Sequence, residues 1–388
     1  MNLTCAKFAA DVPSAYCAGN RAPIAPTSNI SLVGMLVVAV AMDLEAGAVQ
    51  QLWCPDAACT AHSVLQTTYA HEAFPHAVVT ELLLNNSGGA RPLTLSLTPA
   101  PVQPEMSRVA EPEQANSKFG KGMDCMKWKH TPLSIAPSTH TLSVGVLAAA
   151  NKKGGSVSLA VAAHSAPAQL HAPAHGMGGS ATGGALVLVS SRWSSAEAPK
   201  GDAVAATKAD MQLLLGLAGN GSAALWLQHE AAFAQRRLRG GAARGGAPIS
   251  VEGNPRLALL LNASWYALMG TAPRPDAELN RFGTGISSLN TNGYNGRTFW
   301  DMDTWVAPNF LLFGPDGAAD GCIAFRYDEM PIAQHCASMF KYKGLDYPWD
   351  VCYGATVKGT RKAQCPEDGS GHTEIHIGTP STSSFHQF

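Results

Sequence analysis

Two folding units in succession, a β-sandwich and then a helical domain, are predicted by a change in the spacing of apolar residues near Lys200. Before that point, short apolar runs are bounded by Gly, Pro, Asn or Ser, which is typical of strands and turns. After it, Ala, Leu, Gln and Glu recur at helical spacing. A series of strands followed by a series of helices indicates a separate helical domain rather than an α/β fold.

The first unit is expected to cover residues 29–198, after an N-terminal segment, 1–28, that is rich in Ala, Pro and Ser and is expected to be poorly ordered. Two long segments rich in Gly, Pro or small residues, 98–122 and 165–184, are predicted to be insertions over the sandwich surface. The runs expected to form strands are 32–42, 77–84, 93–97, 142–147, 157–163 and 185–189.

A helical linker is expected over residues 199–250, because helical spacing at 202–217 and 222–238 is followed by the Gly-rich run 240–246. Residues 251–388 would then form the helical domain.

Within that domain, an amphipathic helix is predicted over 255–269. Two further helices are expected over 303–313 and 320–340, with kinks at Pro308 and Pro331, because proline lacks the amide hydrogen that helices need. The polar end of the chain is predicted to be loop.

The composition excludes several classes of function. Net charge is −1 and no block of like charge occurs, so nothing marks a nucleic-acid or membrane-surface partner. No apolar run reaches the roughly 18 residues of a membrane-spanning helix. Charged residues make up 14% of the 388, below the roughly 25% of an average globular protein, so the few charges that cluster are informative.

The compartment stays open on the sequence alone. An odd number of cysteines, nine, is scattered without a zinc-binding spacing, which predicts free thiols in a reducing compartment. The first residues lack the apolar core of a signal peptide, and this slightly favours the cytoplasm. A secretory route is the alternative, indicated by a mild excess of N-glycosylation sequons, five in number, at Asn2, Asn29, Asn85, Asn220 and Asn262.

An unusual concentration of aromatic and acidic residues lies in segment 292–305. Aromatic rings can cover the apolar faces of a sugar, and carboxylates can accept its hydroxyl protons. The alternative is a buried aromatic cluster in which one aspartate caps a helix. The residues concerned are Tyr294, Phe299, Trp300, Asp301, Asp303 and Trp305.

The order of several motifs resembles glycoside hydrolase family 65, in particular its glucosylgalactosylhydroxylysine glucosidase and acid trehalase-like branches. Gly296-Arg-Thr-Phe-Trp-Asp-Met-Asp-Thr-Trp305 resembles the family's Phe-Trp-Asp-x-Asp motif. The accompanying segments are Tyr69-Ala-His-Glu-Ala-Phe-Pro-His76, Phe325-Arg-Tyr327, Tyr347-Pro-Trp-Asp350, Cys365-Pro-Glu-Asp368 and Glu374-Ile-His-Ile377.

The resemblance implies an N-terminal β-sandwich and an incomplete (α/α)6 barrel. Twelve helices of about 12 residues with loops of about 4–6 residues need on the order of 200 residues, more than 251–388 supplies. The chain is therefore expected to be truncated and to expose apolar helix faces.

Three departures from the family pattern bear on activity. Arg297 stands where the family usually has His, and Trp349-Asp350 stands where Trp-Glu is common. The family's proton donor is a glutamate in a Gly-Pro-Asp-Glu-Tyr-like motif, which this chain does not contain. Both carboxyl groups of an inverting mechanism, the acid and the base, are expected beyond Phe388.

The residues that remain would hold the sugar. By the resemblance, Asp301 would bind glucose hydroxyls with Trp300 beside the ring, and Asp303 would either do the same or cap the next helix. Further candidates for substrate binding are Trp349, Asp350, Glu374 and His376, although Glu374 and His376 are equally compatible with structural roles.

No cofactor and no metal site is expected. His71 and His76 flank a turn, but no third ligand is placed near them, and His171 and His175 fall in a Gly/Ala-rich segment.

The implied function is an inverting α-glucoside hydrolase acting on glucosylgalactosyl-hydroxylysine or a trehalose-like disaccharide, with this chain itself inactive. The alternatives are a non-catalytic carbohydrate-binding protein and a disaccharide phosphorylase of the same family.

Overall fold

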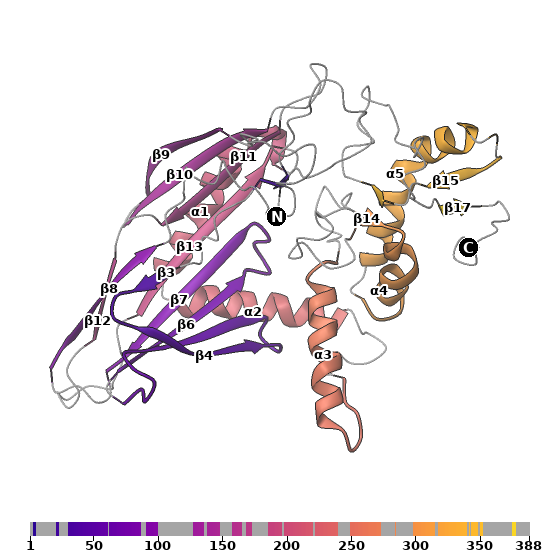
Figure 1. Cartoon of the computed structure of the whole chain (residues 1–388). Helices are drawn as coiled ribbons and strands as arrows, with labels where there is room; N and C mark the ends of the chain where they lie inside the picture. The colour runs from indigo at the N-terminus through magenta and orange to yellow at the C-terminus, as the bar shows by residue number, and fades with distance from the viewer. Residues whose placement is uncertain are drawn as a thin grey trace, which may run out of the picture.

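In a computed structural model the chain forms a large β region followed by helices (Figure 1). The structure describes residues 3–4, 21–22, 30–60, 62–86, 91–99, 127–135, 138–147, 157–164, 168–172, 185–195, 198–219, 222–239, 249–272, 284, 298–314, 317–339, 341, 343–347, 350–351 and 375–377.

An antiparallel eight-stranded sheet is the largest element, in the order β4-β5-β6-β7-β13-β11-β10-β9. Its strands are β4 (Leu36–Asp43), β5 (Ala48–Cys54), β6 (Ser63–Ala70), β7 (Ala77–Asn85), β13 (Ala185–Ser194), β11 (Val157–His164), β10 (Ser138–Leu147) and β9 (Lys127–Ile135). A three-stranded sheet comprises β12 (Ala168–Ala172), β8 (Leu93–Pro99) and β3 (Ile30–Leu32), and β1 (Leu3–Thr4) pairs with β2 (Arg21–Ala22).

A first apolar core lies between these two sheets. Alternating side chains of the large sheet, including Leu82, Leu84 and Val64, are buried there with Leu97 and Leu170 of the smaller sheet. The β-sandwich predicted from the apolar runs is thus confirmed.

One expected strand, 32–42, is divided in the structure. Gly34, with a φ of 76°, makes a turn that sends β3 into the small sheet and β4 into the large one. A continuous apolar run cannot reveal such a turn, because both strands that it feeds are apolar.

The other face of the large sheet is covered by helices. These are α1 (Ala203–Gly219) and α2 (Ser222–Arg239), preceded by the short turn η2 (Pro199–Gly201). Met211, Leu214 and Leu225 are buried there against Tyr69 and Val79 of the sheet. The segment expected to be a linker therefore packs on the sandwich along most of its length.

A buried polar junction connects the sandwich to the helices that follow. His229 of α2 bonds through Nε2 to the Ala46 carbonyl at 2.7 Å and accepts a hydrogen bond from the Glu72 amide at Nδ1. Glu72 forms an ion pair with Arg236 at 3.1 Å. Arg236 also donates to the carbonyls of Met269 and Ala272 at the end of the next helix.

The two histidines that flank the β6–β7 turn have structural partners. His71 bonds through Nε2 to the Leu225 carbonyl at 3.1 Å, and the His76 ring stacks on Trp193 at 3.6 Å between centroids. Within the described residues, no group of three or more His, Cys, Asp or Glu side chains could hold a metal ion.

The remaining elements are helical with short strand pairs. They comprise α3 (Pro255–Met269), the π-helical turn η3 (Met302–Val306), α4 (Ala307–Phe313) and α5 (Ala318–Met339). β14 (Thr298–Phe299) pairs with β16 (Asp350–Val351), and β15 (Leu345–Tyr347) pairs with β17 (Ile375–Ile377). A helical region after the sandwich, with Pro331 inside α5, agrees with the sequence prediction.

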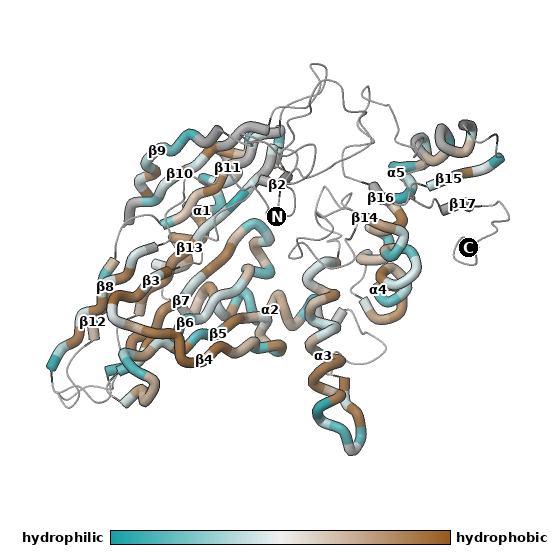
Figure 2. Tube along the Cα trace, viewed as in Figure 1, coloured by the Kyte–Doolittle hydropathy of each residue, from teal (hydrophilic) through white to brown (hydrophobic). Residues whose placement is uncertain are grey.

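Apolar side chains are exposed on these helices, as the sequence led us to expect. α3 has no buried residue, and brown, hydrophobic stretches run along α3 and the edge strand β4 in Figure 2. The exposed side chains on α3 and α4 are Leu257, Leu259, Leu260, Leu261, Leu311 and Leu312. None of the helices in the described part of the chain has the length and hydropathy needed to span a membrane.

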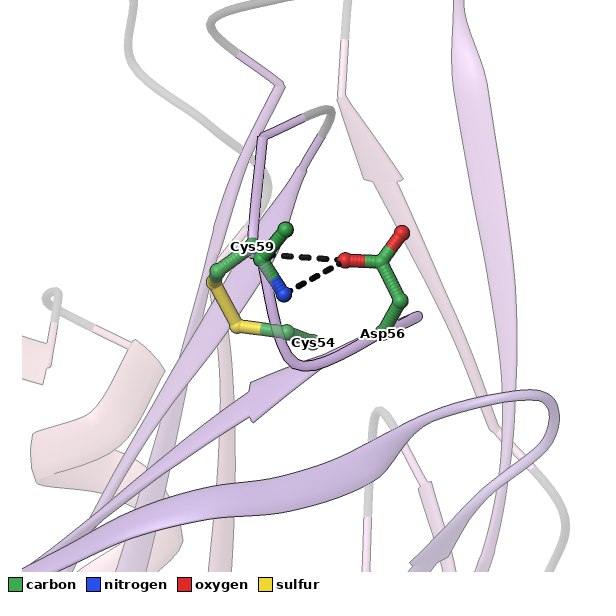
Figure 3. The surroundings of a disulfide bond; sticks show 4 residues. Cys54, Asp56 and Cys59 are labelled. Atoms are coloured by element: carbon green, nitrogen blue, oxygen red, sulfur yellow. Dashed lines mark hydrogen bonds between the residues drawn. A yellow bond between two sulfur atoms is a disulfide. The ribbon is translucent and has the colours of Figure 1, made fainter.

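The prediction of free thiols is wrong for one pair. A disulfide joins Cys54, at the end of β5, to Cys59, with 5.2 Å between the Cα atoms (Figure 3). The short loop is held by Asp56, whose Oδ1 accepts hydrogen bonds from the amides of Ala58 and Cys59. The number and spacing of the cysteines do not indicate which of them are brought together by a short loop. Cys322 is free and buried, and burial raises the pKa of its thiol to about 11.

The buried side chain of His71, next to His229, should make the stability of the folded chain depend on pH. Burial, and then the neighbouring His229, lower the pKa of His71 to about 4, so the unfolded chain takes up a proton at a higher pH than the folded chain. We expect the wild type to lose more free energy of unfolding than His71→Gln as the pH falls from about 6.5 to 4. Denaturant titrations at several pH values measure this difference. Replacement of the exposed His171 by Gln is the control, and equal losses in wild type and His71→Gln would contradict the prediction.

Candidate functional site

The segment that links β14 to α4 has a widened helical turn. The Trp300 carbonyl accepts hydrogen bonds from the amides of Asp303 and Thr304, and the Ala307 amide donates to the Met302 carbonyl, five residues back. Pro308 has no amide hydrogen to donate to the preceding turn, and it lies in the first turn of α4, where proline is tolerated. π-helical turns of this kind are frequent at functional sites.

Arg326 of α5 is the centre of the polar contacts around this turn. Its Nε and NH2 groups donate to both carboxylate oxygens of Asp303, and its NH2 group also donates to the Phe299 carbonyl at 3.1 Å. Its NH1 group donates to Glu329 at 2.9 Å. A planar guanidinium suits such forked pairing, so the Asp303 side chain is fixed from one side by α5.

Glu329, one helical turn after Arg326, is a buried acid. Its side chain is 2% exposed, and its Oε1 atom has no hydrogen-bond partner among the described residues. Burial raises the pKa of Glu329 to about 7, against the opposing effect of Arg326.

β15 completes this part of the site. Tyr347, buried on β15, donates its hydroxyl to the Arg326 carbonyl at 3.1 Å, and its ring lies 5.5 Å from the guanidinium.

Asp301 differs from its neighbour Asp303. It is half-buried, and no other side chain in the described part of the chain bonds to its carboxylate. Burial raises the pKa of Asp301 above its ordinary value. It follows half-buried Trp300, whose ring packs against Tyr347 and Ala333 and lies 6.5 Å from that of Trp305. Of the two predicted aspartates, only Asp301 thus lacks a side-chain partner in the described part of the chain. Asp303 makes no helix-capping hydrogen bond, because its carboxylate bonds to Arg326.

Of the other residues predicted to bind substrate, two are located by strand pairing and two lie outside the described residues. Asp350 pairs with Phe299 between β16 and β14, two residues before Asp301, and His376 pairs with Asp346 beside Tyr347. Trp349 and Glu374 lie outside the described residues. The backbone thus brings described segments that are distant in sequence to one place, namely 299–303, 326–329, 345–347 with 350, and 375–377.

Sequence reasoning missed the roles of three residues in this cluster. Arg326 and Tyr347 lie in motifs that carried the family resemblance, but nothing in the motifs indicated their contacts. Glu329 is three residues after Arg326, a spacing that puts the two on one helix face, and this was the only available signal.

Comparisons with known proteins agree with the motifs. Residues 263–384 match the family model of the glycosyl hydrolase family 65 central catalytic domain. The protein-glucosylgalactosylhydroxylysine glucosidase of Gallus gallus is 33% identical over 148 residues, which cover 37% of this chain and 20% of the relative. A kojibiose hydrolase of Flavobacterium johnsoniae is 33% identical over 102 residues, covering 26% of this chain and 14% of the relative.

The fold also has a solved counterpart. A putative kojibiose phosphorylase from the human microbiome superposes with a TM-score of 0.57 and 13% identity, covering 85% of this chain and 42% of that one. This likeness shows a shared fold. The chain spans only a fraction of the length of each of these relatives.

Removing the Arg326 charge should destabilise the helical region. In Arg326→Met, buried Glu329 loses its counter-charge and must take up a proton, and Asp303 loses its forked partner, so we expect a loss of about 3–5 kcal/mol in the free energy of unfolding. Denaturant unfolding measures it. The double variant Arg326→Met, Glu329→Gln should recover part of the loss, because the amide needs no counter-charge, and Arg256→Met at an exposed position of α3 is the control. A loss in Arg326→Met no larger than in Arg256→Met would refute this role.

Proposed function

We propose, from the match of residues 263–384 to the family 65 catalytic domain, that this chain supplies the glucose-holding side of a site that cleaves α-glucosides. The supporting observation is the contrast between the two aspartates of the Asp-Met-Asp sequence. Arg326 fixes Asp303, whereas no side chain in the described part of the chain bonds to the Asp301 carboxylate. In this proposal α3, α4 and α5 are the first helices of an (α/α)6 barrel.

Sugar binding at this place follows from the chemistry of the side chains. A carboxylate can accept two hydroxyl protons at once, and hydrogen bonds to a charged acceptor are stronger than those between neutral groups. The indole rings of Trp300 and Trp305, 6.5 Å apart, offer apolar surface for the C–H faces of the same ring. Partial burial of Asp301 strengthens these bonds, because water competes less for the carboxylate.

Bond cleavage needs two carboxyl groups, one to protonate the leaving oxygen and one to activate water. We assign neither role to a residue of this chain. Glu329 is buried among Arg326, Ala333 and Tyr347, and we regard its carboxyl as structural. In a phosphorylase, phosphate would replace the activated water.

The substrate class that we propose is a glucosyl disaccharide unit. The relatives are named for glucosylgalactosylhydroxylysine and kojibiose, and both present a glucose unit attached to another sugar. A trehalose-like disaccharide remains a further candidate on the motifs. Release of glucose distinguishes transfer to water from transfer to phosphate, which yields glucose 1-phosphate.

Loss of the Asp301 charge should weaken sugar binding. In Asp301→Asn the charged acceptor becomes a neutral amide, and we expect affinity for kojibiose to fall about tenfold or more. Calorimetric titration of the 388-residue chain measures it, with Asp320→Asn at an exposed position of α5 as the control. Equal affinity in Asp301→Asn and wild type would refute the role of Asp301.

The purified chain of these 388 residues should show no turnover. Without an assigned proton donor, we expect no release of glucose from kojibiose or glucosylgalactosyl-hydroxylysine, and no glucose 1-phosphate when phosphate is added. Coupled glucose assays and chromatography of the sugar phosphates measure the two products. Sustained production of either one would show that a catalytic acid lies within the chain.

A further inference from the structure

A cleft of about 360 Å³ opens in the β-sandwich, away from the Asp301 site. Four polar or aromatic side chains line it, Gln51, Trp53, Gln66 and Thr68, together with the apolar side chains of Ile30, Val37 and Val49. These residues come from β3 of the small sheet and from β4, β5 and β6 of the large sheet, which are labelled in Figure 1. Its size is within the range of small-molecule sites, roughly 300–1,000 Å³.

The strand alternation explains why these side chains meet. Residues two apart share one face of a strand, so Val49, Gln51 and Trp53 of β5 point to the same side. The register places Gln51 opposite Gln66, and Val49 opposite Thr68, on β6. Polar residues thus replace apolar ones on a face that is otherwise core.

A chain of hydrogen bonds fixes the polar groups of the cleft. Trp53 donates through Nε1 to Gln66 Oε1 at 3.0 Å, and Gln66 Nε2 donates to Thr68 Oγ1 at 3.2 Å. Thr68 continues the chain to Thr80. Gln66 is only 4% exposed, so the orientation of its amide is set by these partners. One of its two amide hydrogens is used in this chain, and the other can donate to a ligand.

Among the polar side chains of the cleft, Gln51 has the most unused hydrogen-bond donors and acceptors. Its amide makes no hydrogen bond within the described part of the chain, although it lines the cleft beside Gln66. A primary amide offers two donors and an acceptor with two lone pairs, so it can both donate to and accept from a hydroxyl.

The lining selects the class of ligand. It contains no charged side chain, so phosphates, carboxylates and cations would lose their hydration without compensation. An indole ring, two amides and a hydroxyl beside aliphatic groups match a molecule with apolar C–H faces and many neutral hydroxyls. A purely apolar ligand would leave the Gln51 amide buried without a partner.

The surroundings extend and stabilise the same surface. On β4, Val40 lies opposite Gln51 and Met42 lies opposite Val49. Both therefore lie on the face of the sheet that carries the cleft, where their side chains are 63% and 55% exposed. At the other end, the Cys54–Cys59 disulfide constrains the residue that follows Trp53. We propose that this cleft is a second carbohydrate site that binds a neutral saccharide of one or two rings.

The test uses the Asp301→Asn chain, in which binding at the helical site is weakened, and the difference between Gln51→Leu and Gln50→Leu assigns the remaining binding to the cleft. Saturation-transfer difference NMR with kojibiose as the probe should show saturable binding in this background. Adding Gln51→Leu should weaken it by about three- to tenfold, since one or two neutral hydrogen bonds are lost. Gln51 has no partner in the hydrogen-bond chain, so this change leaves the fold intact.

The matched control is Gln50→Leu, the neighbouring amide on the opposite face of β5, which should leave kojibiose binding unchanged. Trp53→Phe is a second variant, which keeps an aromatic ring but removes the Nε1 donor that orients Gln66, and it should also weaken binding. Absence of saturable binding in the Asp301→Asn chain would overturn the proposal. So would equal weakening by Gln50→Leu and Gln51→Leu, or equal binding of charged glucuronate and kojibiose.

Discussion

The pairing of Arg326 with two acids and one carbonyl is the interaction on which the helical part of the site depends. A single guanidinium contacts Asp303, Glu329 and the Phe299 carbonyl, and thereby ties the strand before the π-helical turn to the turn itself and to α5. Because Tyr347 bonds to the backbone of Arg326, β15 is held by the same residue. Breaking a buried pair of this kind costs more than forming it contributes, so it fixes one arrangement more than it adds stability.

That arrangement gives two nearby aspartates different tasks. Asp301 and Asp303 are two residues apart and chemically identical, and in a regular helix they would point in different directions by about 200°. With the widened turn, the Asp303 carboxylate bonds to α5, while the Asp301 carboxylate has no side-chain partner in the described part of the chain. The acid that α5 binds keeps the turn in place, and under the proposed function the other would bind the sugar.

Short apolar runs bounded by turn residues were enough to predict the sandwich, since they depend only on neighbours along the chain. The helical spacing of apolar residues likewise predicted the helices, including the one that contains Pro331. What the sequence could not supply were pairings between distant residues, such as Arg326 with Asp303 across 23 positions or Trp193 with Asp210 of α1. The Gly34 turn and the Cys54–Cys59 disulfide were missed for a local reason, because their signals were hidden in an apolar run and in a scattered set of cysteines.

The junction around Arg236 determines how the sandwich can influence the helices. Its guanidinium bonds to Glu72 of the sandwich and also to the Met269 and Ala272 carbonyls at the end of α3, where the helix dipole favours a positive charge. Gly47 allows α2 to approach this junction, because a Cβ there would lie 2.6 Å from the Phe233 ring. α3 has no fully buried residue, and it is positioned by these end contacts together with ring contacts on its sides, Tyr266 with Phe233 and Trp265 with Phe313. Within the described residues, this junction thus links the sandwich to the end of α3 by hydrogen bonds from a single arginine.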